Sequence, residues 1–108
     1  MKKRYLLTVH SDAEKDIDAS FQWGCRRWGR RNAKAWVREL HHAIVNRLTS
    51  TPLSCSIAPE SEELEIPVRQ LILGRCRVLY VVEKKTVTIL HVRGAYEGLT
   101  GRRDFPDN

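Results

Sequence analysis

The chain has 108 residues and carries 19 Lys and Arg against 13 Asp and Glu, which gives it a formal net charge of +6. This length is typical of one domain with one hydrophobic core, and a composition of 42% hydrophobic and 30% charged residues excludes a disordered chain. No apolar run is long enough to cross a membrane. Because the N-terminal residues also lack the apolar region and cleavage site of a secretion signal, we expect a cytoplasmic protein that binds no membrane.

The excess of basic residues favours an acidic partner: nucleic acid, an acidic protein segment or an anionic membrane surface. The three cysteines, Cys25, Cys55 and Cys76, are odd in number and form no Cys-x-x-Cys pair. The adjacent residues His41 and His42 point about 100° apart on a helix, so they cannot bind one metal ion. We therefore predict free thiols in a reducing compartment, no metal site and no cofactor.

The first half of the chain predicts a strand and two helices. Residues 5–9 form a short β-prone run, and residues 11–14 (Ser-Asp-Ala-Glu) have the form of a helix capping box. We expect Gly29 to end this first helix, since glycine readily adopts the left-handed conformation found after a last helical turn. A second helix is expected from about Asn32 to the residue before Pro52. The two helices should form an antiparallel hairpin.

Each predicted helix carries an apolar stripe that should face the sheet. The stripe of the first helix comprises Ala13, Ile17, Phe21, Gly24 and Trp28. The stripe of the second helix comprises Ala33, Trp36, Val37, Leu40, Ala43, Ile44 and Leu48. Trp23 falls beside the first stripe, so we expect it to be partly exposed.

The second half of the chain predicts three strands. The β-prone runs follow a polar connection over residues 52–65 and lie at 66–73, 76–83 and 86–93. Gly74-Arg75 and Lys84-Lys85 are the expected tight turns. We expect residues 95–108 to form a flexible tail, which leaves 1–94 as the domain. The order of elements predicts an α+β fold in which the helical hairpin covers one face of a small antiparallel sheet.

Two-residue turns would fix the pairing of the strands and the face of each residue. The helix-covered face would then carry Arg69, Leu71, Leu73, Cys76, Val78, Tyr80, Val82, Val87, Ile89, His91 and Arg93. The opposite face would carry Val68, Gln70, Ile72, Arg77, Leu79, Val81, Thr88, Leu90 and Val92. This second face is left open and is the expected place for function, with Gln70 and Arg77 as its polar side chains.

Two sets of short segments carry a resemblance to a known family. The helical half contributes Phe21-x-Trp23, Ala33-x-x-Trp36, Leu40, Leu48-x-x-x-Pro52 and Ala58-Pro59-Glu60. The strands contribute Val68-Arg69-Gln70-Leu71, Gly74-Arg75, Arg77-Val78-Leu79-Tyr80 and Val87-x-Ile89-Leu90-His91-Val92-Arg93-Gly94. In this order, over about residues 5–96, they resemble the RelE/ParE superfamily of bacterial toxins, whose fold is a small antiparallel sheet packed against a helical hairpin.

The resemblance implies the toxin of a type II toxin–antitoxin pair, of the kind known as plasmid stabilisation proteins, which inhibit growth. Such a toxin is held inactive in a hetero-oligomer by a small acidic antitoxin, which the charge of +6 would suit. ParE-like toxins inhibit DNA gyrase, whereas RelE-like toxins cut mRNA in the ribosome. The two long predicted helices resemble the ParE branch more, so we expect a gyrase inhibitor. A RelE-like mRNA endoribonuclease is the alternative.

The resemblance also implies candidate site residues. RelE-like toxins use lysines on the second strand, an arginine at the start of the third, and an arginine and a tyrosine near the C-terminus. Arg77 matches the third-strand arginine, but Val68 and Gln70 stand at the lysine positions, and neither can act as a general base. A ribonuclease would have to use a variant set made of Arg69, Arg77, His91, Arg93 and Tyr96. The candidates for binding a target or partner are Arg69, Gln70, Arg77 and Arg93.

Some of these residues have a purely structural alternative. Arg69 and Arg77 would then bridge the strands to a carboxylate such as Glu60 or Glu65, and Tyr80 would be a core residue. A second alternative for the whole chain is a generic basic nucleic-acid-binding module, which a basic α+β domain of this size would suggest. Its basic residues include the Arg-Arg-Trp-Gly-Arg-Arg run at 26–31. Against it, the predicted sheet exposes no pair of aromatic rings for base stacking, and no helix concentrates arginines as a groove-reading helix does.

Overall fold

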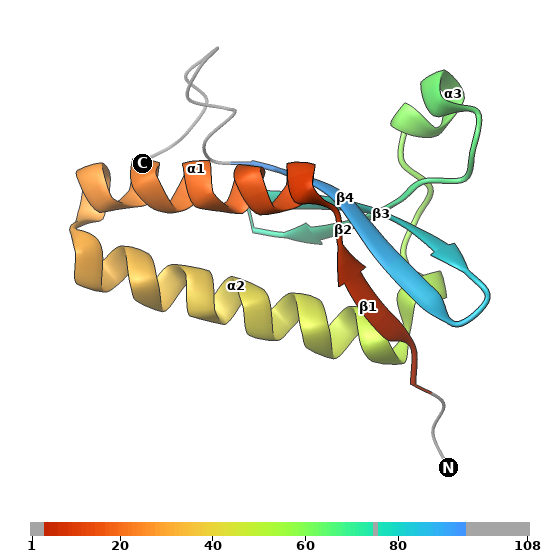
Figure 1. Cartoon of the computed structure of the whole chain (residues 1–108), viewed down its shortest axis with the longest axis horizontal. Coiled ribbons are helices and arrows are strands. Elements are labelled where there is room, and N and C mark those ends of the chain that lie inside the picture. Colours follow the sequence, from red (N-terminus) through yellow and green to blue (C-terminus); the bar gives the residue numbers. More distant parts are fainter. Residues whose placement is uncertain (1–3, 75, 95–108) are drawn as a thin grey trace.

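The computed structural model describes residues 4–74 and 76–94, so the predicted tail and Tyr96 lie outside the described residues. The elements in chain order are β1 (Leu6–Val9), α1 (Ser11–Trp28), α2 (Arg30–Ser50), η1 (Pro52–Ser54), α3 (Glu60–Leu64), β2 (Arg69–Leu73), β3 (Cys76–Glu83) and β4 (Thr86–Arg93). The predicted order of one strand, a helical hairpin and three strands is confirmed (Figure 1). The polar connection between the hairpin and β2 contains two short helices that the sequence did not indicate, η1 and α3.

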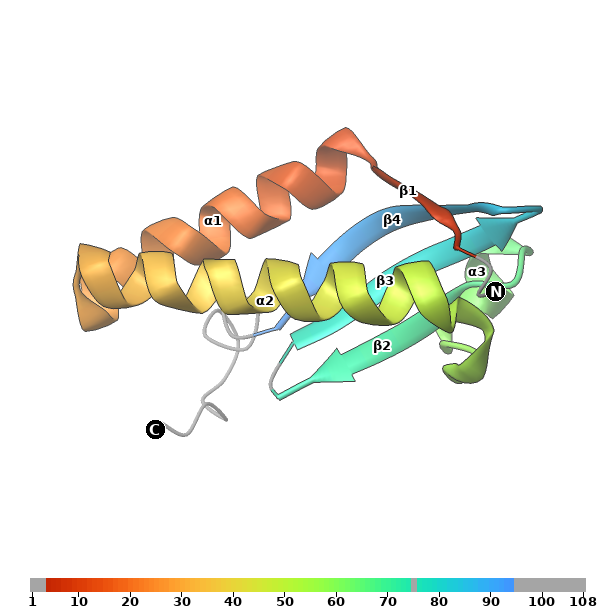
Figure 2. The same ribbon diagram turned by 90° about the horizontal axis from the view of Figure 1, so that it is seen from below.

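The four strands form one sheet in the order β1-β4-β3-β2. The three later strands are antiparallel neighbours, but β1 is parallel to β4. The sheet is therefore mixed, and the expectation of a fully antiparallel sheet was wrong. The cause is topological: the helical hairpin returns the chain to the end at which β1 starts, so β2 runs in the direction of β1. Two reversals later, β4 has that direction again and pairs with β1 (Figure 2).

A single residue, Gly29, joins the two long helices. Its φ of 92° and ψ of 155° lie in a region that only glycine occupies readily, so Gly29 ends α1 as predicted. The same residue also caps α2, which therefore begins at Arg30, two residues earlier than expected. At the start of α1, the cap is His10 and not the predicted Ser11 box, because His10 Nδ1 accepts a hydrogen bond from the backbone N–H of Asp12 at 3.0 Å.

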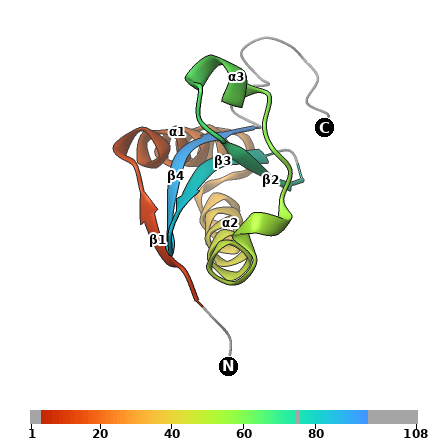
Figure 3. The same ribbon diagram turned by 90° about the vertical axis from the view of Figure 1, so that its right-hand side faces the viewer.

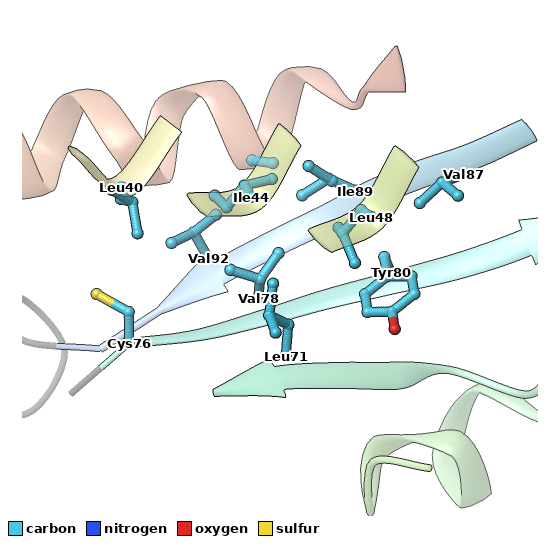
Figure 4. Packing of buried hydrophobic residues seen from close by; sticks show 11 residues of the cluster. Leu40, Ile44, Leu48, Leu71, Cys76, Val78, Tyr80, Val87, Ile89 and Val92 are labelled. Atoms are coloured by element: carbon cyan, nitrogen blue, oxygen red, sulfur yellow. The ribbon is translucent and has the colours of Figure 1, made fainter. Parts of the chain in front are cut away.

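The main core fills the space between the helical hairpin and one face of the sheet (Figure 4). Its buried residues are Ala13, Leu40, Ile44, Leu48, Leu71, Cys76, Val78, Tyr80, Val87, Ile89 and Val92. The apolar stripe of α2 is thus confirmed as core-facing over its C-terminal half, whereas Trp36 is only half-buried. Tyr80 is fully buried, with its hydroxyl donating to the carbonyl of Pro52 at 2.5 Å.

The opposite face of the sheet is partly covered, although the sequence predicted it to be open. A second cluster of buried residues lies there, made of Ala58, Val68 and Leu79 with Val81 and Leu90 packed against it. The segment around α3 provides this cover, and the sheet lies between α2 on one side and α3 on the other (Figure 3). Any functional group on this face must therefore share it with α3.

A β-bulge changes the predicted faces at the end of β4. The register shifts between Leu79 and Tyr80 on β3, so that Leu79 pairs with His91 and Tyr80 with Ile89. The extra residue on β4 reverses the alternation beyond it. Val92 therefore joins the main core, while His91 and Arg93 move to the face that carries Arg77. The expected placement of these three residues was wrong for this reason.

Three tryptophans pack together near Gly29, where the two helices of the hairpin meet. The ring of Trp28 meets Trp23 at 5.2 Å and Trp36 at 5.7 Å between centroids, both edge to face. Gly24 permits this approach, since a Cβ there would lie 3.0 Å from the Trp28 ring. Trp23 is 6% exposed, so the expectation that it is partly exposed was wrong. Trp28 is the outer member of the group, at 40% exposed.

Candidate functional site

Arg77 lies at the centre of a polar cluster on the face of the sheet opposite the helical hairpin. Its guanidinium donates to both carboxylate oxygens of Glu60, at 3.3 Å to Oε1 and 2.7 Å to Oε2. It also donates to Oε1 of Gln70 at 2.8 Å. An arginine fork on two carboxylate oxygens is a strong and geometrically specific pair. The structural alternative for Arg77, a bridge to Glu60, is therefore confirmed.

Hydrogen bonds to the backbone of Val68 hold Glu60 beside Arg77. The N–H of Ala58 donates to the carbonyl of Val68 at 2.7 Å. The Ser61 hydroxyl donates to the same carbonyl at 2.9 Å and accepts from the N–H of Val68 at 2.7 Å. Because these contacts fix the residues on both sides of Glu60 to the start of β2, the carboxylate is positioned by the fold of the connection.

The charges of two arginines act on the carboxylate of Glu60. Arg93 lies directly opposite Arg77 on the neighbouring strand, where like charges repel and destabilise the pair. The hydrogen bonds from Arg77 hold the pKa of Glu60 below its usual value, and the charges of Arg77 and Arg93 lower it further. Glu60 therefore stays ionised at neutral pH and offsets part of the repulsion between the two guanidinium groups.

Glu60→Gln should lower the free energy of unfolding by about 1 kcal/mol at pH 7, the upper end for a partly exposed ion pair. A carboxyl whose pKa is lower in the folded than in the unfolded state stabilises the fold above its unfolded pKa. This contribution is lost as the pH falls through the folded pKa. The difference between wild type and variant should therefore begin to close as the pH falls below about 4.5 and should be lost below the lowered pKa of the folded state.

Urea unfolding at a series of pH values measures this difference. The matched control is Glu63→Gln, on the exposed side of α3, which should change stability by less than about 0.5 kcal/mol. A Glu60→Gln difference that persists unchanged down to about pH 3 would show that the charge of Glu60 does not stabilise the fold.

His91 forms a second polar contact beside this cluster. Its Nδ1 lies 3.2 Å from Oδ2 of Asp16 on α1, and the same oxygen accepts the N–H of Val92 at 2.9 Å. The strand β1 ends at Val9, so the outer edge of β4 has no strand neighbour beside Val92. Asp16 supplies the missing acceptor there. Asp16 is not among the predicted site residues, because its approach to β4 depends on how α1 packs and leaves no local signal in the sequence.

The structure brings four of the predicted residues to one face and leaves one apart. Gln70, Arg77, His91 and Arg93 share the face covered by α3. Arg69 pairs with Tyr80 and so faces the other side, where its guanidinium donates to the carbonyl of Cys55 at 2.7 Å and to that of Leu53 at 3.4 Å. Arg69 thus ties the connection after α2 to β2, although to backbone carbonyls and not to a predicted carboxylate.

A groove of about 600 Å³ lies between α1 and α2. Its apolar side chains are Ile17, Phe21 and Val37, each half-buried. The predicted stripes placed these three facing the sheet. Ile17 does pack against the main core, whereas Phe21 and Val37 lie half-buried at the groove. Charged and polar side chains border them: Glu14, Asp18, Lys34, Arg38 and His41.

Over residues 4–74 and 76–94, no three His, Cys, Asp or Glu side chains are close enough to hold a metal ion. In the same part of the chain, no helix is both long and apolar enough to cross a membrane.

The family model described as "ParE toxin of type II toxin-antitoxin system, parDE" matches residues 7–97. Among solved structures, the chain is similar to a chain of the chromosomal ParDE toxin–antitoxin system of P. aeruginosa. The TM-score is 0.69 at 22% identity, over 84% of this chain and 96% of that chain. It is also similar to a chain of the RelBE2 toxin–antitoxin complex of Mycobacterium tuberculosis. The TM-score is 0.59 at 18% identity, over 89% of this chain and 97% of that chain. No curated protein matches significantly.

Proposed function

The chain belongs to the ParE toxins of type II toxin–antitoxin systems, and we propose that it inhibits DNA gyrase and is held inactive by a small acidic antitoxin. The RelE/ParE resemblance offers two targets, gyrase and ribosome-bound mRNA. The observation that favours gyrase is that the guanidinium of Arg77 already forms hydrogen bonds with Glu60 and Gln70.

Metal-free RNA cleavage needs a base for the 2′-hydroxyl and cations for the developing phosphorane charge. Val68, at one lysine position of the RelE-like toxins, is fully buried. Gln70, at the other, accepts a hydrogen bond from Arg77. Arginine remains protonated at neutral pH and is a poor base. These observations support a toxin that acts by binding its target.

The contact between His91 and Asp16 is the one observation that favours a ribonuclease. An imidazole oriented by a carboxylate is the arrangement of a general base, and His91 shares a face with Arg77. The RelE-like alternative therefore keeps a specific candidate, His91, and the test must include it.

The groove between α1 and α2 supports the antitoxin half of the proposal. Its apolar side chains, Phe21 among them, offer a site for the apolar face of a partner helix. Lys34 and Arg38 border the groove on α2 and would attract acidic residues of such a helix. Both features suit a small acidic segment that folds on binding.

The test adds purified toxin to a gyrase supercoiling assay and, in parallel, to translating ribosomes. The expected result is blocked supercoiling with intact mRNA, reversed by the acidic protein encoded next to the toxin. Codon-specific mRNA cuts that disappear in His91→Gln would overturn the proposal in favour of the ribonuclease. Full supercoiling activity at a large molar excess of folded toxin would also contradict it.

Phe21→Ala should weaken antitoxin binding about tenfold or more, because burial of this ring against a partner is worth about 1.5–3 kcal/mol. Gyrase inhibition should remain at the wild-type level if the groove serves the antitoxin alone. Calorimetric titration of the toxin with antitoxin measures the change. The control is Gln22→Ala, an exposed neighbour on α1, and equal affinities of the two variants would place the antitoxin elsewhere.

A further inference from the structure

The net charge of the protein is concentrated in one part of the fold. Between Asp18 and Glu39 the chain holds six basic residues and no acidic residue. These residues are Arg26, Arg27, Arg30, Arg31, Lys34 and Arg38, and all six are exposed. Their number equals the net charge of +6, so the rest of the chain has as many acidic as basic residues.

The six cations lie on either side of Gly29, at the end of α1 and over the first half of α2; we name this region the hairpin tip. Figures 1 and 2 show the tip extending past the strands, at the end of the molecule opposite the turn between β3 and β4. The tip is therefore a projecting surface and not a cleft. It is accessible to a large, extended partner.

The position of Arg30 and Arg31 is unfavourable for the helix that carries them. They occupy the first turn of α2, which has no acidic residue and no side-chain cap. Positive charge there opposes the helix dipole, whose N-terminal end is itself positive. An anion bound at the tip would remove this penalty, because it would be attracted both to the arginines and to the free N–H groups of the first turn.

Aromatic rings support two of the arginines. The guanidinium of Arg27 lies over the ring of Trp23 at 5.6 Å, and that of Arg30 lies over Phe21 at 5.9 Å. These contacts restrict the long side chains before any partner binds, which lowers the entropic cost of binding. Together with the tryptophan packing around Gly24, they make the tip a preorganised cationic surface.

We propose that the hairpin tip binds the phosphate backbone of duplex DNA. An acidic protein segment is the weaker candidate over these arginines, because it would need apolar contacts. Among the described aromatic rings beside them, Trp28 is exposed, whereas Trp23 is buried and Phe21 is half-buried beneath Arg30. Single-stranded nucleic acid is usually held by several stacking rings, and Trp23 is buried. The major groove of A-form RNA is too deep and narrow to admit the end of a helix. The major groove of B-DNA is about 12 Å wide, so the end of a helix can enter it and contact the phosphates on either side.

This surface is additional to the proposed gyrase inhibition and does not require it. It shares Lys34 and Arg38 with the groove proposed for the antitoxin, whereas Arg26 and Arg31 do not line that groove.

The test measures binding of purified full-length toxin to a fluorescent DNA duplex of arbitrary sequence at salt concentrations from about 50 to 200 mM. The logarithm of affinity should fall with the logarithm of salt concentration, with a slope of up to about −5 for six phosphate contacts. Arg26→Gln/Arg31→Gln should reduce the steepness of this slope by about 2 and weaken binding. Arg26→Lys/Arg31→Lys should keep most of the binding, because it keeps the charge.

The matched control is Lys15→Gln/Lys84→Gln, which removes the same charge from exposed positions away from the tip. It should leave the slope and the affinity within about twofold of wild type. Equal weakening by both double variants would show that only net charge matters, and would overturn the proposal. Tighter binding to RNA duplex, to single strands or to polyglutamate at the same salt concentration would also overturn it. Circular dichroism confirms that each variant is folded.

Discussion

Tyr80→Ala should lower the free energy of unfolding by about 3–5 kcal/mol, the range for truncating a fully buried aromatic ring. Tyr80 is the largest fully buried side chain of the described residues and lies on β3 between the helical hairpin and the connection that follows it. Its hydroxyl is the donor that satisfies the carbonyl of Pro52. Burial raises the pKa of this hydroxyl, so it keeps its proton and remains a donor at neutral pH.

Tyr80→Phe separates the hydrogen bond from the packing. It keeps the ring and leaves the Pro52 carbonyl without this donor, which should cost about 1–3 kcal/mol. Urea unfolding of wild type and both variants measures the two contributions. If Tyr80→Phe were as destabilising as Tyr80→Ala, the ring would contribute little to the core. A loss below about 1 kcal/mol for Tyr80→Ala would show that Tyr80 is not a core residue.

The sequence was sufficient to predict the order of the helices and strands. It was insufficient to predict which face of the sheet the last residues of β4 occupy. The β-prone runs and the tight turns between them located β3 and β4 to the residue, and Gly29 located the end of α1, whereas the predicted cap at Ser11 placed the start of α1 one residue late. The parallel pairing of β1 depends on the path of the whole chain, and the bulge beside Leu79 depends on packing between strands. Neither has a local signature, so His91 and Arg93 were placed on the wrong face.

The candidate site also contains contacts that the sequence predicted and contacts that it did not. The bridge from Arg77 to Glu60 was a predicted alternative, because an arginine in a strand needs an anionic partner when it is partly buried. Asp16 and Ser61 were not predicted, since both act on backbone groups that only the tertiary structure brings to them. The cations at 26–31 form a run in the sequence, but only the exposed helical hairpin shows that they gather on one projecting surface.

Cleavage of mRNA on translating ribosomes should be slower by a factor of about 10⁴ or more than that of a RelE-like toxin with both lysines. A positioned acid or base contributes about 10²–10⁴-fold, and a charge-stabilising donor contributes about 10²–10³-fold. By the resemblance to RelE-like toxins, Val68 and Gln70 stand at the two lysine positions. The remaining cation of the matching set, Arg77, would have to exchange Glu60 for a phosphate group before it stabilised any developing charge.

Single-turnover assays with programmed ribosomes and purified toxin measure this rate, beside the supercoiling assay. Glu60→Gln releases Arg77 from its carboxylate and still provides no base, so it should not bring cleavage above the background. Gln70→Lys restores one lysine position on the same face and should give at most a partial gain. Fast, codon-specific cleavage by wild type, lost in Arg77→Ala and in His91→Gln, would show that His91 replaces the missing lysines as the base. The gyrase proposal would then be replaced by the ribonuclease, with the pair of His91 and Asp16 as the basic group and Arg77 as the cation.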